Sequence, residues 1–308
     1  MFTENFSLEQ KNNISKLIKN ITIEAIDKEM NELIKIGNNA HNISSRIRTG
    51  NNIVDYFTFT QRLHTKGKYN INYFEFISNI EEFKHKKFIQ NMLHYYDTVK
   101  NKSKKKNEYI VYKEVYNICI SAINIIRPLV YMEIYSKYNP KSILDFCAGW
   151  GGAAVAASAL NIINYTGIEI NNNLKEPYNK LIEYLDKKSS TQINMIFDNC
   201  LNVDYNNLYY DFVFTSPPYY FIQKYENNID YASKREMDEL FYKPIFKKVF
   251  DGLQNEGYFI INVCKEVYDN VLIKLFGEAN EIYPYKKSKR QNDYNEIVYV
   301  WKKSINTT

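Results

Sequence analysis

Hydrophobic residues recur at steps of three and four through much of the first third of the chain, which is the spacing of one face of an α-helix. This pattern predicts helix over residues 7–36, 70–98 and 109–139, and the Asn-, Ser- and Gly-rich stretch 37–52 is typical of a loop. Glycine is nearly absent before residue 142, which also favours helix over strand. The sequence therefore predicts a mainly helical N-terminal region.

From Asn139-Pro140 onward, short apolar runs alternate with amphipathic stretches. Buried strands are expected over Ser142–Cys147, Tyr165–Ile170, Ile193–Phe197, Asp211–Thr215, Tyr258–Val263 and Glu296–Lys302. Helices are expected between most of them, over 152–162, 173–187 and 233–253. Strands that alternate with helices indicate βαβ units and a mostly parallel sheet with helices on both faces. We therefore expect an α/β, Rossmann-like fold.

Composition narrows the class of protein. Of the 308 residues, 45% are hydrophobic and 16% aromatic, which excludes a wholly disordered chain. The longest apolar runs are too short to span a bilayer, and residues 1–10 lack the basic start and apolar stretch of a signal peptide. The four cysteines contain no CxxC pair, so we expect neither a zinc site nor a disulfide framework, and no other metal. A soluble, intracellular protein is predicted.

The net charge of +5 is concentrated in the N-terminal part. Residues 1–142 contain 22 Lys and Arg against 14 Asp and Glu, whereas the remainder has a small acidic excess. A basic surface suits a polyanion such as nucleic acid, because binding releases counterions. The residues that we expect to contact nucleic acid are Lys104, Lys105, Lys106, Lys286, Lys287 and Arg290.

A glycine-rich turn follows the first predicted strand. The sequence there is Asp145-Phe146-Cys147-Ala148-Gly149-Trp150-Gly151-Gly152, and an alanine-rich helix comes next. Glycines permit a tight turn and let a ligand approach the backbone. The candidate cofactor contacts in this turn are Asp145, Cys147, Ala148, Gly149 and Gly151.

Acidic residues end the next two predicted strands. Glu169 lies 18 residues beyond Gly151, where a carboxylate commonly binds the hydroxyls of a ribose. Asp198 and Asn199 follow the third strand, where a carboxylate is placed to accept the amino group of an adenine. Together these residues predict a cofactor that contains adenosine, with NAD and S-adenosylmethionine both open at this point.

The motif Ser216-Pro217-Pro218-Tyr219 follows the fourth strand and separates these two cofactors. Consecutive prolines stiffen the segment and remove N–H donors, which leaves the Ser216 hydroxyl and the Pro217 carbonyl as acceptors for an NH₂ group. Tyr219 offers a ring on which a flipped-out base can stack, worth roughly 1–3 kcal/mol. The motif therefore favours methyl transfer to an amino nitrogen over hydride transfer.

These residues resemble the Rossmann-like amino-methyltransferases that use S-adenosylmethionine, whose hallmark is (Asp/Asn/Ser)-Pro-Pro-(Tyr/Phe/Trp). Over residues 120–302 the chain is similar to a group of DNA methyltransferases common in phages and large DNA viruses. The resemblance implies a catalytic domain over 121–308, a basic helical region over 1–120 that is a candidate for nucleic-acid recognition, and catalytic placement of a flipped base by Ser216, Pro217, Pro218 and Tyr219. It also implies S-adenosylmethionine as cofactor, DNA as partner, and adenine or cytosine as target.

Several alternatives remain open at this stage. An RNA amino-methyltransferase would use the same pocket. A protein-glutamine methyltransferase usually has Asn in place of Ser216, so the sequence argues against it. A catalytically silent nucleic-acid-binding protein on the same scaffold would not need intact Asp145, Glu169 and Ser216–Tyr219. Only about 65 residues separate the glycine turn from the motif, so sequence-specific recognition would have to come from the N-terminal region or from loops 220–235 and 284–294.

Overall fold

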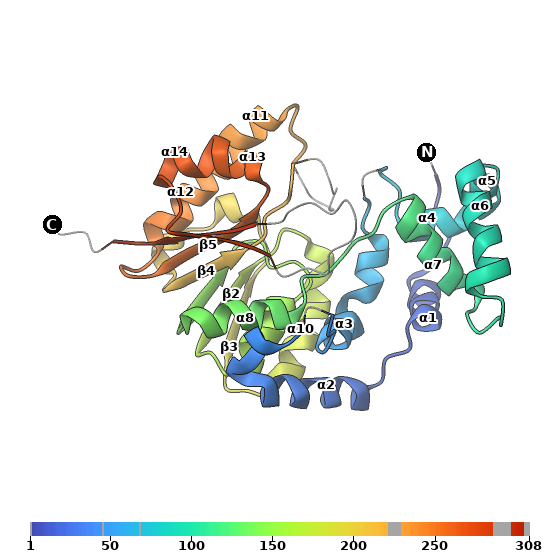
Figure 1. The fold of residues 1–308 in the computed structure, drawn as a ribbon, viewed down its shortest axis with the longest axis horizontal. Helices are drawn as coiled ribbons and strands as arrows, with labels where there is room; N and C mark the ends of the chain where they lie inside the picture. Colours follow the sequence, from blue (N-terminus) through green and yellow to red (C-terminus); the bar gives the residue numbers. More distant parts are fainter. Residues whose placement is uncertain (1, 45, 68, 221–228, 286–296, 305–308) are drawn as a thin grey trace.

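A computed structural model describes residues 2–44, 46–67, 69–220, 229–285 and 297–304. The chain forms a sheet-containing body with a helical lobe beside it (Figure 1). Within the described ranges no helix is both long and apolar enough to cross a membrane.

The centre of the molecule is a seven-stranded sheet in the order β3-β2-β1-β4-β5-β7-β6. The strands are β1 (Ser142–Asp145), β2 (Asn164–Ile168), β3 (Gln192–Ile196), β4 (Phe212–Thr215), β5 (Tyr258–Val263), β6 (Glu281–Pro284) and β7 (Ile297–Lys302). Neighbours from β3 to β5 pair in parallel, and β7 is antiparallel to both β5 and β6. The α/β, Rossmann-like fold is thus confirmed, with all six predicted strands present and β6 as an additional edge strand.

The strand order reverses between β1 and β4, because the chain moves outward to β2 and β3 before it returns to β4. In open α/β sheets such a reversal leaves a crevice at the carboxyl ends of the strands, where ligands bind. The pairing supports this placement, since β1 and β4 are parallel neighbours with Leu144 beside Val213, so that their carboxyl ends point to the same edge of the sheet. The glycine turn and the Ser216–Tyr219 motif both begin at this point.

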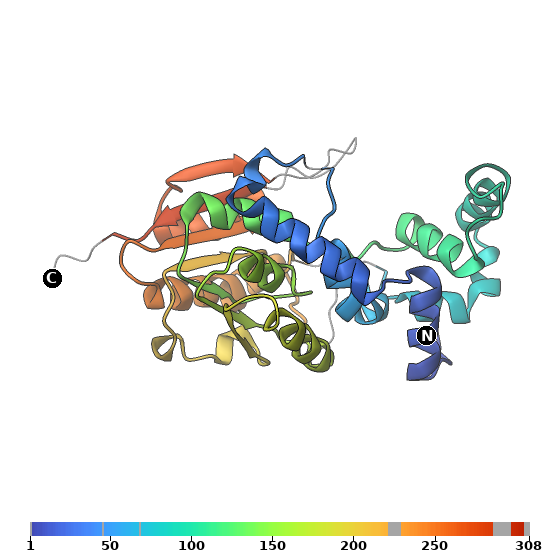
Figure 2. The same cartoon turned by 90° about the horizontal axis from the view of Figure 1, so that it is seen from below.

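Helices cover both faces of the sheet (Figures 1 and 2). One face of the sheet carries a buried cluster to which Ile143, Phe212 and Phe214 belong. The helices that contribute to this cluster are α2 (Ile23–Ile36), α3 (Asn51–His64), α8 (Pro128–Tyr138), α9 (Gly152–Ala159) and α10 (Lys175–Leu185). On the other face, Leu144 and Val213 pack with α11 (Lys234–Met237), α12 (Lys243–Gly252) and α13 (Lys265–Val267), and α14 (Ile273–Phe276) borders this cluster. Successive side chains along β1 and β4 therefore point to opposite faces of the sheet, and each face has its own buried cluster.

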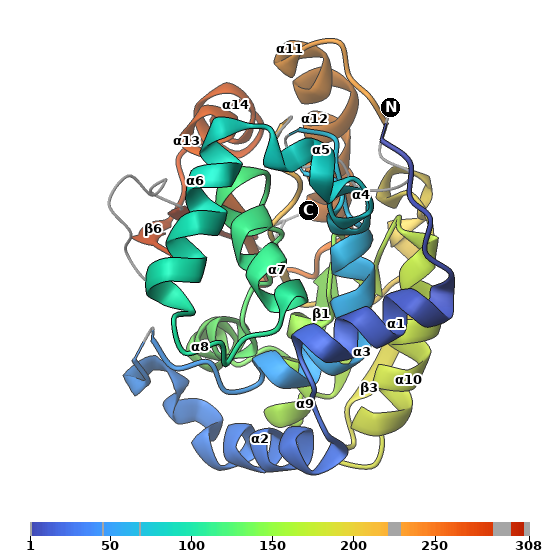
Figure 3. The same ribbon diagram turned by 90° about the vertical axis from the view of Figure 1, so that its right-hand side faces the viewer.

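The helical lobe has a buried cluster of its own, which includes Ile14, Leu63, Phe74 and Tyr116. Its helices are α1 (Leu8–Ile18), α4 (Tyr73–Ser78), α5 (Ile80–Lys84), α6 (Lys87–Tyr95) and α7 (Glu108–Cys119). Figure 3, in which the lobe faces the viewer, shows these helices in front of the sheet. Helix α3 lies between the two parts, because Leu63 belongs to the cluster of the lobe and Ile53 and Val54 to that of the sheet.

The helices differ from the predicted ranges in four places. The predicted helix 70–98 is divided into α4, α5 and α6. The predicted helix 7–36 is two helices, because the chain is extended at Lys19 and Thr22 caps α2 through Ala25 N–H. The predicted loop 37–52 contains the 3₁₀ helix η1 (Gly37–Asn42) and the first residues of α3. The predicted helix 109–139 is interrupted before α8, which begins at Pro128, as expected of a residue that favours the first turn.

Candidate functional site

The glycine turn after β1 is tight on one side and open on the other. Gly149 and Gly151 have positive φ angles of 57° and 91°, which L side chains rarely adopt. A Cβ at Gly151 would lie 2.6 Å from Leu181 Cδ2, whereas a Cβ at Gly149 would meet nothing nearer than the Cys147 carbonyl at 3.9 Å. The turn therefore packs against α10 at Gly151 and leaves space beside Gly149.

One hydroxyl fixes this turn from outside, and a second lies in contact with it. The Tyr178 hydroxyl of α10 contacts the carbonyls of Ala148 and Gly149, each at 3.1 Å. The Thr58 hydroxyl of α3 donates to the Val54 carbonyl at 2.8 Å and lies 3.5 Å from the Trp150 carbonyl. The turn is therefore held by α10 and packs against α3, the helix that connects the sheet body to the lobe.

Asp145 joins the glycine turn to the neighbouring strand. Its carboxylate is fully buried and accepts from the Thr215 hydroxyl at 2.7 Å, from Cys147 N–H at 3.2 Å and from the Tyr165 hydroxyl at 3.4 Å. Burial raises its pKa to about 6, although these three donors oppose the shift. Because Thr215 immediately precedes Ser216, Asp145 connects the predicted cofactor turn to the predicted catalytic motif.

Glu169 lies just beyond the end of β2, as predicted. Its two carboxylate oxygens accept from Gly149 N–H at 2.8 Å and from Asn171 N–H at 2.9 Å. Burial raises its pKa to about 7, against the lowering effect of these backbone donors. The structure thus brings Glu169 and Gly149 into direct contact, and the Ile170 backbone also hydrogen-bonds to this carboxylate.

Asp198 and Asn199 follow β3 as predicted. One oxygen of Asp198 accepts from Asn199 N–H at 2.6 Å and from the Asn202 amide at 3.0 Å, and its side chain is exposed. The Asn199 side chain accepts from Leu201 N–H at 3.0 Å, which starts a short 3₁₀ turn. Asn199 is therefore occupied by the turn itself, whereas Asp198 keeps an oxygen for which the described residues provide no donor.

The cysteine of the turn is not activated. A hydrogen bond with the Cys200 thiol and burial both raise the pKa of the Cys147 thiol. Cys147 therefore stays protonated at neutral pH, which is the state of an inert packing residue.

The Ser216–Tyr219 motif is held by a residue that sequence reasoning missed. Asn262 of β5 has 1% of its surface exposed. Its Oδ1 atom accepts from the Tyr219 hydroxyl at 2.7 Å and from the Ser216 hydroxyl at 3.2 Å, and these two hydroxyls lie 3.3 Å apart. The available clue was a polar residue inside the apolar strand Tyr258–Val263, because buried amides need partners.

A second residue that was missed, Tyr242, fixes the end of the motif. Its hydroxyl donates to the Pro218 carbonyl and accepts from Tyr220 N–H at 3.3 Å. Tyr220 has a φ of 37°, which is uncommon for a residue with a side chain, and its hydroxyl donates to Asp238 at 2.9 Å. The Pro217 carbonyl, in contrast, receives no donor from the part of the chain that the structure describes.

The run Lys104–Lys106, predicted to contact nucleic acid, lies in a different part of the molecule. Lys104 pairs with Asp97, and Lys106 pairs with Glu114 at 2.7 Å, while Lys105 is exposed. Figure 1 places the connection between α6 and α7, which carries this run, on the side of the lobe away from the sheet. Lys286, Lys287 and Arg290 lie outside the described residues.

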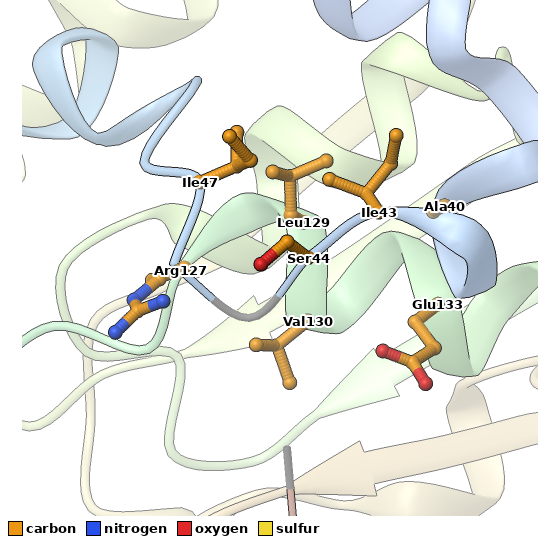
Figure 4. Close-up of a pocket in the computed structure, with 8 residues that line it drawn as sticks. All are labelled: Ala40, Ile43, Ser44, Ile47, Arg127, Leu129, Val130 and Glu133. Atoms are coloured by element: carbon orange, nitrogen blue, oxygen red, sulfur yellow. The ribbon is translucent and has the colours of Figure 1, made fainter. Parts of the chain in front are cut away.

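Two hollows lie beside α8 and η1. One, of about 450 Å³, is lined by residues of η1, α8, β6 and β7, including Lys137 and Tyr283. The other lies beside the start of α8, where Arg127 and Ser44 border an apolar floor (Figure 4). Neither contains a residue of the glycine turn or of the Ser216–Tyr219 motif, so both are separate from the candidate site.

Comparisons with known proteins give structural neighbours only. No protein-family model matches the sequence, and no curated protein matches it. Among solved structures, TrmN from Thermus thermophilus is 14% identical with a TM-score of 0.41, over 57% of this chain and 48% of that one. An rRNA methylase from Streptococcus thermophilus is 14% identical with a TM-score of 0.37, over 59% and 100%. NSun6 from Pyrococcus horikoshii, solved with SFG, is 12% identical with a TM-score of 0.37, over 54% and 48%. This chain thus spans about half the length of TrmN, and the likeness is one of fold.

Proposed function

We propose that the protein is a methyltransferase that moves a methyl group from S-adenosylmethionine to the exocyclic amino group of adenine or cytosine in DNA. The observation that carries the proposal is the position of the Ser216–Tyr219 motif beside the glycine turn, joined to it through Asp145 and Thr215. Two acceptors for an amino group, the Ser216 hydroxyl and the Pro217 carbonyl, thus lie next to a candidate cofactor site.

The residues around the turn fit S-adenosylmethionine. Space beside Gly149 would admit the ligand, and the Glu169 carboxylate beyond the end of β2 would accept from a ribose hydroxyl. Asp198 keeps an acceptor at the end of the neighbouring strand, suited to the amino group of adenine. Asp145 would support the turn from below, since its carboxylate is already bonded to three groups of the protein. When bound, this cofactor supplies an electrophilic methyl group on a sulfonium.

The protein would contribute position more than acid–base chemistry. Ser216 and the Pro217 carbonyl would orient the amino group so that its lone pair points away from the ring plane. Tyr219 would pack against the flipped base, with its hydroxyl fixed by Asn262. The amino nitrogen becomes acidic once it is methylated, so its proton can pass to water without a dedicated base. Orientation of this kind contributes on the order of 7–11 kcal/mol in favourable cases.

The experiment that tests the proposal is transfer of tritium from labelled cofactor to DNA, RNA and protein in parallel. We expect label in DNA, and at least a hundredfold less from Ser216→Ala combined with Tyr219→Ala. Tyr209→Ala is a matched control, because Tyr209 is 64% exposed and outside the site. Label in RNA alone would instead establish the RNA amino-methyltransferase. Wild-type activity in the double variant would refute the assignment of the motif, and label in none of the three would refute methyl transfer to these substrates.

A further inference from the structure

Both ends of the Asn262 amide are hydrogen-bonded, one as a donor and the other as an acceptor. The Nδ2 group donates to the Ile297 carbonyl of β7 at 3.0 Å. The Oδ1 atom accepts from Tyr219 and Ser216 of the motif. Since Asn262 is buried, water cannot replace either partner.

The Ile297 carbonyl determines which way the amide points. A carbonyl can only accept, so it requires the NH₂ end of Asn262. The reversed amide would place two oxygens against each other at Ile297 and leave a buried acceptor without a donor. The carbonyl oxygen of Asn262 is therefore directed at the motif.

This orientation determines the direction of the Ser216 hydroxyl. A serine has one hydrogen to donate and two lone pairs to accept with. The single hydrogen of Ser216 is directed to Asn262 Oδ1 at 3.2 Å or to the Tyr219 oxygen at 3.3 Å, both inside the cluster. What Ser216 can present to a ligand is consequently a lone pair. The Pro217 carbonyl beside it is also an acceptor, so the two groups together accept and cannot donate.

We propose that Asn262 is a positioning residue that determines specificity, because it fixes the Ser216 hydroxyl as an acceptor and so makes the site select a base with an amino group over one with a carbonyl group at the same place. This inference rests on the proposed function and names the feature by which its substrate is selected. Cytosine and adenine carry the required amino group. Uracil and hypoxanthine, which have a carbonyl in its place, would set oxygen against oxygen.

The test measures base preference rather than activity alone. A labelled single-stranded oligonucleotide would be bound in the presence of S-adenosylhomocysteine and displaced by unlabelled competitors. The competitors form two pairs that are otherwise identical in sequence: cytosine against uracil, and adenine against hypoxanthine. For the wild type we expect the amino form to compete at least tenfold better in one pair, the usual loss when a buried polar group lacks a partner. In Asn262→Leu the Ser216 hydroxyl can rotate and donate, so the preference should fall below about threefold.

Controls separate this effect from a general loss of structure. Asn280→Leu replaces an exposed asparagine just before β6, whose side chain accepts from Lys302 N–H and has no contact with the motif, and it should keep the full preference. Cofactor affinity within twofold of wild type would show that Asn262→Leu is folded. If it is not folded, Asn262→Asp decides, because its buried carboxyl group, when protonated, can donate to the Ile297 carbonyl through one oxygen and accept from Ser216 through the other, and so should retain the preference. Ser216→Ala combined with Asn262→Leu should lower the preference no further than Ser216→Ala alone, since Asn262 acts through Ser216.

The outcomes also separate this inference from the proposed function. Equal preference in wild type and folded Asn262→Leu would overturn the role of Asn262 while leaving methyl transfer intact. Loss of the preference in Asn262→Asp would likewise overturn it. A wild type that transfers label to nucleic acid without any amino-over-carbonyl preference would overturn the inference alone, and a wild type that transfers no label to nucleic acid would overturn both.

Discussion

Replacement of Asp145 by asparagine is the sharpest test of how the site is built. The asparagine keeps an oxygen for Cys147 N–H and Thr215, and its NH₂ group faces the Tyr165 oxygen, which can accept. The variant therefore keeps the shape and the hydrogen bonds while it removes a buried charge.

The magnitude follows from the titration of the carboxyl group. Its pKa is raised by burial from 3.8 to about 6 in the folded protein. A raised carboxyl pKa stabilises the fold at low pH, and this contribution is lost as the pH rises through about 6. Between pH 5 and pH 8 the wild type should lose roughly 1.4 kcal/mol of unfolding free energy that the asparagine variant does not lose, because about one pH unit separates pH 5 from the midpoint.

The assay is urea unfolding of both proteins at pH 5 and pH 8. We expect the difference in unfolding free energy to move in favour of Asp145→Asn by about that amount at the higher pH. Asp145→Leu is the control for lost hydrogen bonds, since it leaves Cys147 N–H buried without a partner, and it should destabilise by about 2–4 kcal/mol at both pH values. A pH-independent difference between wild type and Asp145→Asn would refute the raised pKa and the reasoning built on it.

Three further predictions concern other contacts. Gly151→Ala should weaken cofactor binding at least tenfold and lower the melting temperature measured by calorimetry, because the φ angle of Gly151 is positive and Leu181 occupies the place of a Cβ. Gly277→Ala is the control: its φ angle is also positive but its Cβ would meet no neighbour, so cofactor binding should be unchanged. Tyr242→Phe removes the donor to the motif, so we expect kcat for methyl transfer to fall roughly tenfold with cofactor affinity unaltered, and equal loss of both would contradict this. Lys113→Met should raise the free energy of unfolding in urea, and more at pH 6 than at pH 9. Burial lowers the pKa of this lysine to about 7, so its charged form destabilises the folded protein most at low pH. A gain in stability that did not vary with pH would disprove the explanation.

The fold was predictable where the pattern along the chain is simple. Strands such as Tyr258–Val263 are nearly uninterrupted apolar runs, and the glycine turn and the two prolines mark the ends of β1 and β4. Strand β6 was missed because Glu281–Pro284 lies at the sheet edge with little burial and so lacks an apolar run. Helix α3 was missed because it buries residues on two sides, toward the sheet and toward the lobe, which obscures a single apolar face.

The site was predictable only in part, for a related reason. Residues at strand ends, such as Glu169 and Ser216, can be placed from the sequence because the carboxyl ends of parallel strands meet. Asn262 and Tyr242 act through contacts between segments more than 20 residues apart in the sequence. Which hydroxyl bonds to which amide depends on the packing of β5 and α12 against the motif, and one sequence does not specify that packing. The division at residue 120 stays a prediction.

Helix α3 has a consequence for how the protein can be divided. Its first half is core to the sheet and its last turn is core to the lobe, and between them Thr58 contacts the glycine turn. A truncation that discards the first 64 residues would therefore expose apolar surface on the sheet body and on the rest of the lobe, and would remove a packing contact of the turn. The lobe is thus not an attachment that can be cut off at a linker, because the helix that joins it to the sheet body is part of both buried clusters.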